Sequence, residues 1–291
     1  MGLEAEVVLA AQAELGEGPV WDRRTGQLLW VDILAGEVHR FEPVSGKDVK
    51  FVTGQPVGFV VPRASGGVVV GLRDGLAVVD GDWEHLEFLV EIEADDPGTR
   101  MNDGKCDPAG RLWAGTMDFG SGPGSGSLYR VNADWTVTKV LDGVSCSNGL
   151  GWSLDGRLMY YIDSGTNCVD VMDYDLVAGN VSDRRHFVRI ADSEGTPDGM
   201  TVDSEGFLWV AIWGGSAVRR YAPDGTLERV VTLPASQTSS CEFGGSELAD
   251  LYITSAYYEL SLDQLALDPH AGALFRLKPD VIGRPSTQFR G

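Results

Sequence analysis

The chain of 291 residues has few of the residue types that mark several common protein classes. Its four cysteines show neither C-x-x-C spacing nor the density of a small disulfide-bonded secreted domain. Its four histidines are dispersed along the chain, and no G-x-S-x-G segment occurs, so a serine triad is unsupported. We therefore expect reduced, mostly buried cysteines and chemistry that does not depend on histidine.

Long apolar runs and positive charge are also scarce. The longest apolar runs, such as VGFVVP and GGVVVGL, are far shorter than the roughly 20 residues that a membrane-spanning helix needs. The segment MGLEAEVVLAAQAE carries acids where a secretory signal would carry bases. With 43 acidic against 23 basic residues, the net charge of −20 would repel nucleic acid phosphates and anionic lipids. These features predict a cytoplasmic protein whose partners include neither nucleic acid nor a membrane.

An internal repeat of about 40 to 50 residues runs through the whole chain. A turn, an apolar strand and a second strand recur six times, beginning at Thr25, Ser65, Ala109, Asp155, Glu205 and Leu248. Alternating strands, Gly, Asp and Asn turns and little helical periodicity favour an all-β fold. Because a propeller blade has four strands and about 40 to 45 residues, we predict a single domain over residues 1–291, a six-bladed β-propeller of four-stranded blades. A stack of two sheets, which needs no fixed period, is the alternative.

Polar residues recur at one register of this repeat. Counting back eleven residues from Trp113, Met159 and Trp209 reaches Asn102, Asn148 and Asp198. The first repeat places Glu17 at nearly the same level, thirteen residues before Trp30. The second and sixth repeats place Phe59 and Cys241 there, so the position is not polar by structural necessity.

Residues in equivalent register of the innermost strands of a propeller point into the same end of its central channel. Each of these residues could instead cap its own turn, as Asp and Asn often do. Four at matching register favour a shared site. Carboxylate and amide oxygens suit Ca²⁺, Mg²⁺ or Mn²⁺, and Ca²⁺ best tolerates irregular geometry, while Zn²⁺ usually prefers nitrogen or sulfur. We therefore predict a divalent metal site, with Ca²⁺ as the first choice, at one end of the central channel.

The Gly/Ser-rich segment GSGPGSGS, residues 120–127, lies between two strands of the third repeat and opens no helix. It cannot be a phosphate-binding loop, which needs a following helix. We expect a mobile loop over one face of the propeller.

The motifs LGEGPVWD, RMNDGKCDPAGRLWAGTMD, SNGLGWSLDGRLMYYIDS, TPDGMTVDSEGFLWVA and CEFGG follow one another along nearly the whole chain. In this order they resemble the family of gluconolactonases, regucalcin (senescence marker protein) and luciferin-regenerating enzyme. The resemblance implies a six-bladed propeller with one divalent ion held by Glu17, Asn148 and Asp198. It also implies a sugar lactone lying over the ion, with Arg100 and Asn102 binding its hydroxyl groups.

Several functions agree with this resemblance. In a metal-dependent lactonase, the ion would polarise the carbonyl of the ring ester while a carboxylate, Asp198, activates water; whether Asp198 is a base or only a ligand stays open. A calcium-binding regulator without turnover and a propeller hydrolase of aryl esters or phosphotriesters are the alternatives. After GTMD, regucalcin-like members carry an acidic pair that contacts substrate, whereas this chain continues FGSGPGSGS, which leaves the substrate's identity open.

Overall fold

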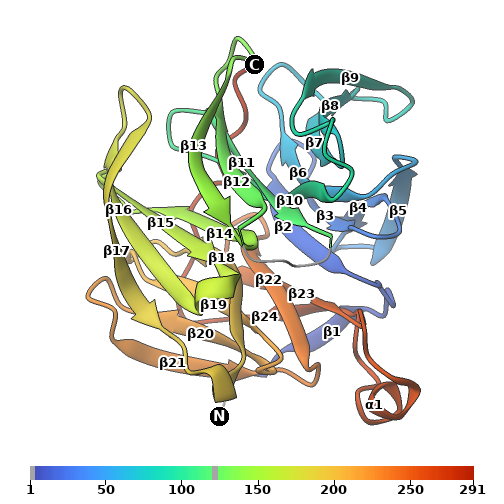
Figure 1. The fold of residues 1–291 in the computed structure, drawn as a ribbon. Coiled ribbons are helices and arrows are strands. Elements are labelled where there is room, and N and C mark those ends of the chain that lie inside the picture. Colours follow the sequence, from blue (N-terminus) through green and yellow to red (C-terminus); the bar gives the residue numbers. More distant parts are fainter. Residues whose placement is uncertain (1–3, 120–123) are drawn as a thin grey trace.

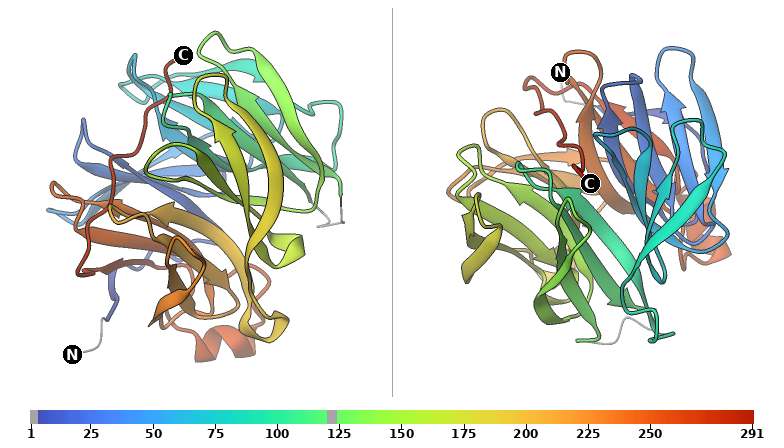
Figure 2. Two further views of the ribbon diagram at one scale, coloured as in Figure 1. Left: turned by 90° about the vertical axis from the view of Figure 1, so that its left-hand side faces the viewer. Right: turned by 90° about the horizontal axis from the view of Figure 1, so that it is seen from above.

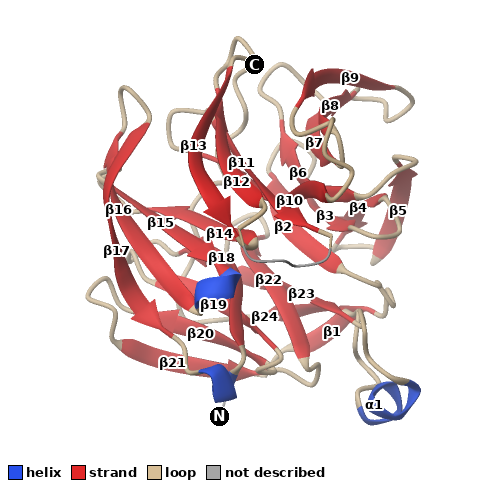
Figure 3. Ribbon diagram, in the orientation of Figure 1, coloured by secondary structure: helices blue, strands red, loops and turns tan. Residues whose placement is uncertain are grey.

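The computed structural model describes residues 4–119 and 124–291. Strands make up nearly all of its regular structure (Figure 3). The helical elements of this part of the chain are α1 (Leu262–Leu267) and the 3₁₀ turns η1 (Ser164–Thr166) and η2 (Asp192–Glu194). None of the described helices is long and apolar enough to cross a membrane. Of the expected mobile loop, residues 120–123 lie outside the described residues, so that expectation stays untested.

Four antiparallel sheets of four strands follow one another along the chain. The first two are β2 (Gly16–Asp22), β3 (Gln27–Asp32), β4 (Glu37–Glu42) and β5 (Lys47–Val52), then β6 (Val57–Pro62), β7 (Val68–Leu72), β8 (Gly75–Val79) and β9 (Leu86–Glu91). The next two are β10 (Thr99–Cys106), β11 (Leu112–Asp118), β12 (Gly126–Val131) and β13 (Val137–Val144), then β14 (Ser147–Trp152), β15 (Leu158–Asp163), β16 (Cys168–Asp175) and β17 (Asn180–Arg189).

The remaining eight strands form two further sets of four. One set is β18 (Thr196–Val202), β19 (Leu208–Trp213), β20 (Ala217–Tyr221) and β21 (Leu227–Thr232). The other is β22 (Gln237–Gly244), β23 (Asp250–Ala256), β24 (Leu274–Leu277) and, from the opposite end of the chain, β1 (Glu6–Leu9). A single pairing, Trp213 with Gln237, joins the two sets.

The first strand of each set lies on the inside of a ring (Figure 1). Each of the strands β2, β6, β10, β14, β18 and β22 contacts the next, and β22 contacts β2, which closes the ring. β1 pairs with β24 and so holds the two ends of the chain in one sheet. The all-β prediction is confirmed, and the four-stranded antiparallel sheets arranged in a ring agree with the expected propeller rather than with a two-sheet stack.

Buried aspartates at the turns after the inner strands anchor the sheets. Asp203 is fully buried; its Oδ1 accepts backbone N–H groups of its own turn, and its Oδ2 accepts from Trp209 Nε1 at 2.9 Å and from Arg220 Nε at 2.8 Å. Asp107 makes the equivalent bond to Trp113 Nε1 at 3.1 Å. Because every oxygen has a partner, these charges can be buried at little cost. They join each turn to the aromatic residue of the second strand.

The C-terminal segment, residues 278–291, comes after β24, contains no named strand and runs across one face of the ring (Figure 2). Its residue Phe289 is fully buried, and Phe289 N and O bond the backbone of Pro62 and Ala64 at 2.9 and 2.8 Å. Residues 284–287 line the adjoining end of the central channel. The channel is therefore covered on this side.

Candidate functional site

Every inner strand contains a β-bulge near the start of its pairing with the second strand. The shifts fall between Glu17 and Val20, Val57 and Phe59, Met101 and Gly104, Ser147 and Leu150, Pro197 and Met200, and Thr238 and Ser240. A bulge adds a residue to one strand and re-aims its side chain. Asn102, Asn148 and Asp198 lie inside these bulges, and the bulge of β2 begins at Glu17. The predicted site residues thus share one level of the ring.

The strand pairing corrects two positions. Counting from the aromatic residue placed Phe59 and Cys241 at the site level, but the bulges of β6 and β22 contain Gly58 and Ser239. Phe59 and Cys241 are instead buried in apolar clusters between sheets. The count fails because it passes through a hairpin of variable length: β22 and β23 have 8 and 7 residues, against 7 and 6 for β18 and β19. The second repeat also has no aromatic residue from which to count.

Two carboxylates, Glu17 and Asp198, are buried together at this level, with 8% and 5% exposure. Glu17 Oε2 accepts from Gly18 N at 3.0 Å, whereas Asp198 Oδ1 has no hydrogen-bond partner. Burial, reinforced by the nearby Asp103 charge, raises the pKa of Glu17 to about 8. Burial, and then repulsion from Glu17, also raises the pKa of Asp198 well above its ordinary value. The pair therefore favours either protons or a cation.

A chain of hydrogen bonds orients the amides beside this pair. Arg100 Nη1 donates to Asn102 Oδ1 at 2.7 Å, and Asn102 Nδ2 donates to Asn148 Oδ1 at 2.8 Å and to Ser147 O at 2.9 Å. Asn148 Nδ2 donates to Ser164 Oγ at 2.8 Å. The Asn148 amide is thus held from both ends, with its oxygen toward Asn102.

Arg100 is a buried cation beside the cluster. It is 5% exposed, and its guanidinium carbon lies 5.7 Å from the Phe119 ring centroid. Burial lowers the pKa of Arg100, while the charges of Glu17 and Asp198 act in the opposite direction. A guanidinium has five N–H donors, so Arg100 keeps donors for a ligand besides those that bond Asn102 and its own neighbour Met101.

The arrangement fits a hard cation. Among the described residues, no group of three or more His, Cys, Asp or Glu side chains could hold one ion, so carboxylates alone do not complete a site. The buried, unpartnered Oδ1 of Asp198, the Glu17 carboxylate and the amide oxygen of Asn148 together supply oxygen donors of the kind that Ca²⁺ and Mg²⁺ accept. Of the predicted set, the structure brings all three of these residues to one level, with Arg100 and Asn102 beside them.

Sequence reasoning missed three charged residues of the same channel. Asp103 follows Asn102 in its bulge, and Lys105 Nζ lies 3.1 Å from Glu242 Oε2. The motif NDGKCD contains two of them, but only the pairing register shows that they face the channel.

Cys146 also lies closer to the site than the sequence indicates. It was expected only to be a buried thiol, yet its Sγ lies 3.5 Å from Asn148 Nδ2 and 3.4 Å from Met117 Sδ. All four cysteines of the chain are free.

Comparison with known proteins gives one consistent result. Residues 15–257 match the SMP-30/Gluconolactonase/LRE-like region. Regucalcin of Danio rerio is 41% identical to this chain over 99% of both sequences, and the putative sugar lactone lactonase YvrE of Bacillus subtilis (strain 168) is 37% identical, again over 99% of both. The crystal structure of regucalcin from Agrobacterium tumefaciens, a calcium-binding protein, superposes with a TM-score of 0.96 at 31% identity over 99% of this chain and 98% of that one.

Proposed function

The chain belongs to the SMP-30/gluconolactonase/LRE-like family, and from that premise we propose that it is a divalent-metal-dependent hydrolase that opens the ring ester of a sugar lactone. Residues 1–291 would form one six-bladed propeller, with the site at the bulge level of its channel. The observation that carries the proposal is the buried pair of Glu17 and Asp198, whose negative charge lacks a partner at Asp198 Oδ1. The native ring, gluconolactone or another aldonolactone, is left open.

Glu17, Asn148 and Asp198 would hold the ion, with Ca²⁺ as the first choice and Zn²⁺, Mn²⁺ or Mg²⁺ as alternatives. When bound, the ion would neutralise the two carboxylates and polarise the lactone carbonyl. The Asp198 carboxylate has two oxygens, so it would hold the ion with one and accept with the other a proton from the water that attacks the carbonyl carbon. The ring C–O bond then breaks, and the leaving alkoxide takes up a proton.

Arg100 and Asn102 would position the sugar. Both N–H groups of the Asn102 amide are already used, by Ser147 O and Asn148 Oδ1, so Asn102 would accept from a sugar hydroxyl through Oδ1. Arg100 would donate to neighbouring hydroxyls with its remaining N–H groups. Binding that fixes the ring in this way places the carbonyl carbon near the attacking water.

A calcium-binding regulator without turnover is the second candidate, because regucalcins are 38–41% identical relatives over nearly the whole chain. Arg100 and Asn102 favour the enzyme. A site that only stores an ion has no use for a buried guanidinium next to the ligands, since its positive charge opposes cation binding.

The test is a panel of aldonolactones, aryl esters and phosphotriesters, with hydrolysis followed by proton release in a pH-stat. Protein treated with chelator is compared with protein resupplied with Ca²⁺, Mn²⁺, Mg²⁺ or Zn²⁺, and calorimetry measures the binding of each ion. We expect ion-dependent opening of at least one lactone. Ion binding without any turnover would favour the regulator, and no binding better than millimolar would end the metal-site proposal.

A further inference from the structure

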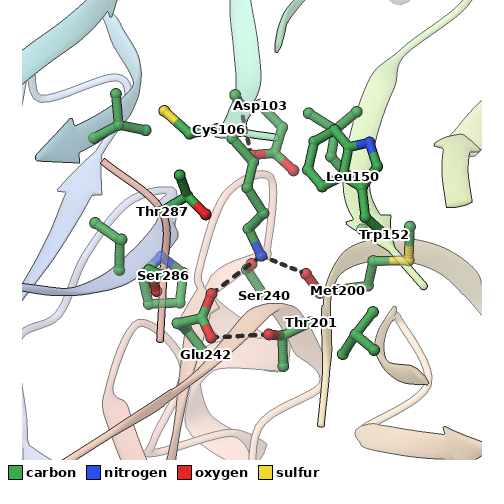
Figure 4. A pocket seen from close by; sticks show the side chains of 18 of the residues that line it. Asp103, Cys106, Leu150, Trp152, Met200, Thr201, Ser240, Glu242, Ser286 and Thr287 are labelled. Carbon is green, nitrogen blue, oxygen red and sulfur yellow. Dashed lines mark hydrogen bonds and ion pairs between the residues drawn. The ribbon is translucent and has the colours of Figure 1, made fainter. Parts of the chain in front are cut away.

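A second layer of the channel lies beneath the candidate site. Its members stand three residues after Glu17, Gly58, Asn102, Asn148, Asp198 and Ser239 in their strands, and they are Val20, Val61, Lys105, Gly151, Thr201 and Glu242. All six line one cavity of about 100 Å³, and Figure 4 shows Thr201 and Glu242 among its lining side chains. None of the proposed ion ligands lines this cavity, but Gly18, Asp103 and Ser240, which adjoin the bulge level, do. The layer therefore lies next to the candidate site along the channel.

An ion pair occupies this layer. Lys105 Nζ lies 3.1 Å from Glu242 Oε2 and donates to Met200 O at 2.9 Å. Glu242 Oε1 accepts from Thr201 Oγ1 at 2.8 Å and from Phe243 N at 2.9 Å, which holds the carboxylate in place (Figure 4). The pair joins the inner strands β10 and β22 across the channel.

The fold does not require this pair. Three of the six positions in the layer are occupied by Val20, Val61 and Gly151, so uncharged residues satisfy the same register. The pair is also a weak stabiliser, because water screens the partly exposed Lys105 and burying Glu242 costs desolvation energy. Its presence under a charged site calls for an electrostatic explanation.

The charges of the two layers can be counted. For the ion-bound state the carboxylates are counted as ionised: those in or beside the two layers are Glu17, Asp103, Asp198 and Glu242, and the cations are Arg100 and Lys105. Four negative charges against two positive ones leave two negative charges, which one divalent ion would balance. Arg284 also lines the cavity, but its guanidinium donates to Trp152 O at 3.2 Å and pairs with none of the four carboxylates, so it is left out of the count.

We propose that Lys105 is a positioning residue that sets the charge of the channel, so that the site accepts a divalent rather than a trivalent cation. Lys105 touches none of the proposed ligands; it acts through its field, offsetting Asp103 and Glu242. The proposal rests on the divalent site of the proposed function. Without the lysine, the channel would hold three uncompensated negative charges and would favour an ion of higher charge.

The experiment compares Ca²⁺ with Tb³⁺, two ions of similar size that both prefer oxygen ligands, by calorimetric titration at pH 7. In Lys105→Met, the ratio of Tb³⁺ affinity to Ca²⁺ affinity should rise about tenfold above wild type, the order expected for one unit charge at an effective dielectric constant of about 20. In Glu242→Gln, which leaves one negative charge, the ratio should fall by a similar factor. Lys105→Arg, which keeps the charge, should retain the wild-type ratio.

The double variant Lys105→Met/Glu242→Gln removes the ion pair but restores two net negative charges, and its ratio should return to the wild-type value. Arg284→Met, which removes the other cation of the same cavity, is the matched control; because Arg284 pairs with none of these carboxylates, it should change the ratio less than Lys105→Met does. If the pair had a purely structural role, every variant that breaks it would lose affinity for Ca²⁺ and Tb³⁺ by a similar factor.

Two negative results are distinguishable. If the wild-type protein binds Ca²⁺ but Lys105→Met leaves the ratio unchanged, the role of Lys105 is wrong while the proposed function stands. If the wild-type protein binds neither ion, the divalent site and the role of Lys105 both fall.

Discussion

Asp198 and Asp203 belong to one short stretch of chain, yet their buried carboxylates have opposite surroundings: one has hydrogen-bond partners for both oxygens and the other does not. Asp203 is fully buried and bonds Trp209, Arg220 and the backbone of its own turn. Asp198 is nearly as buried, at 5% exposure, but its Oδ1 bonds nothing. Burial alone therefore does not distinguish a structural carboxylate from a functional one. What sets Asp198 apart is that its Oδ1 lacks a partner at a level where a second buried carboxylate, Glu17, also stands, and such charges destabilise the fold unless a proton or an ion neutralises them.

The same contrast separates the turn level from the bulge level of the ring. At the turns, Asp107 repeats the bonds of Asp203 because the hairpin itself needs them. At the bulges, the corresponding residues range from Asp198 to Ser239 and Gly58, the last held by close backbone contact, so the fold does not call for one polar residue type there. A position where the fold has no preference but several strands carry polar residues is a position available for function.

The largest effect is expected from Asp198→Asn, which keeps the shape and one oxygen but removes charge and basicity. We expect lactone turnover at saturating ion to fall at least ~10²-fold, the magnitude of a positioned general base. The ion-free protein should be no less stable than wild type, because an unpartnered buried charge is lost. Steady-state kinetics and thermal unfolding measure the two. Near-normal turnover at saturating ion would make Asp198 a ligand only, and Glu17 would become the candidate base.

Asp203→Asn should show the reverse pattern. The substitution leaves the Arg220 guanidinium without its buried carboxylate, although Glu205 and Glu228 remain nearby. We expect the free energy of unfolding to fall by about 3 kcal/mol, while kcat per folded molecule stays within about twofold of wild type. Urea unfolding and active-site-normalised kinetics are the measurements. A loss of kcat without a loss of stability would abolish the distinction between the two aspartates.

How far the sequence predicts this architecture depends on the range of the contacts involved. The all-β fold and its repeat follow from local alternation and turn residues, and Glu17, Asn148 and Asp198 follow from aligning the repeats. The bulges could not be predicted, since they are set by pairing between strands, and the count therefore misplaced Phe59 and Cys241.

The ion pair of Lys105 and Glu242 was even harder to predict from the sequence than the bulges. These residues meet only in the assembled ring, because their strands β10 and β22 belong to different sheets and lie far apart in the chain. No local pattern signals a contact between segments so distant in the chain. The signal that could have found them is the common spacing of three residues from the bulge level, which is visible once the strands are aligned by their pairing.

A pH titration of the ion-free protein tests whether the buried Glu17 carboxylate holds a proton, and the expected change in stability is smaller than the effects above. The pKa of Glu17 is about 8 in the folded protein, against an ordinary value of 4.5. Between these values the folded state binds a proton that the unfolded state has released, so the stability contributed by this group is full below about pH 4.5 and is lost as pH rises through 8. Saturating Ca²⁺ should stabilise the protein most at the upper end of this range. Urea unfolding at several pH values measures the slope.

Glu17→Gln is the control for this titration, because it removes the proton-binding group and keeps the other acidic residues. The variant should lose stability less steeply than wild type between pH 5 and 8. Equal slopes in the two proteins would mean that the Glu17 carboxylate is already charged and paired without an ion, contrary to its burial in the structure.

The smallest effects concern Arg100 and Asn102, for which the sequence predicts one shared role in binding sugar hydroxyls. Their contacts with the ion site differ. Asn102 Nδ2 holds Asn148 Oδ1 at 2.8 Å, so Asn102→Ala should weaken Ca²⁺ binding by up to about tenfold, as expected when the group that orients a ligand is removed. Arg100 contributes an opposing positive charge, so Arg100→Ala should leave Ca²⁺ affinity unchanged or slightly higher while it raises KM for the lactone.

Two measurements separate these effects: calorimetry with Ca²⁺ alone gives the ion affinity, and kinetics at saturating Ca²⁺ give KM for the lactone. If Arg100→Ala weakens Ca²⁺ binding as much as Asn102→Ala does, the guanidinium maintains the geometry of the amides through Asn102, and its place among the substrate-binding residues is lost.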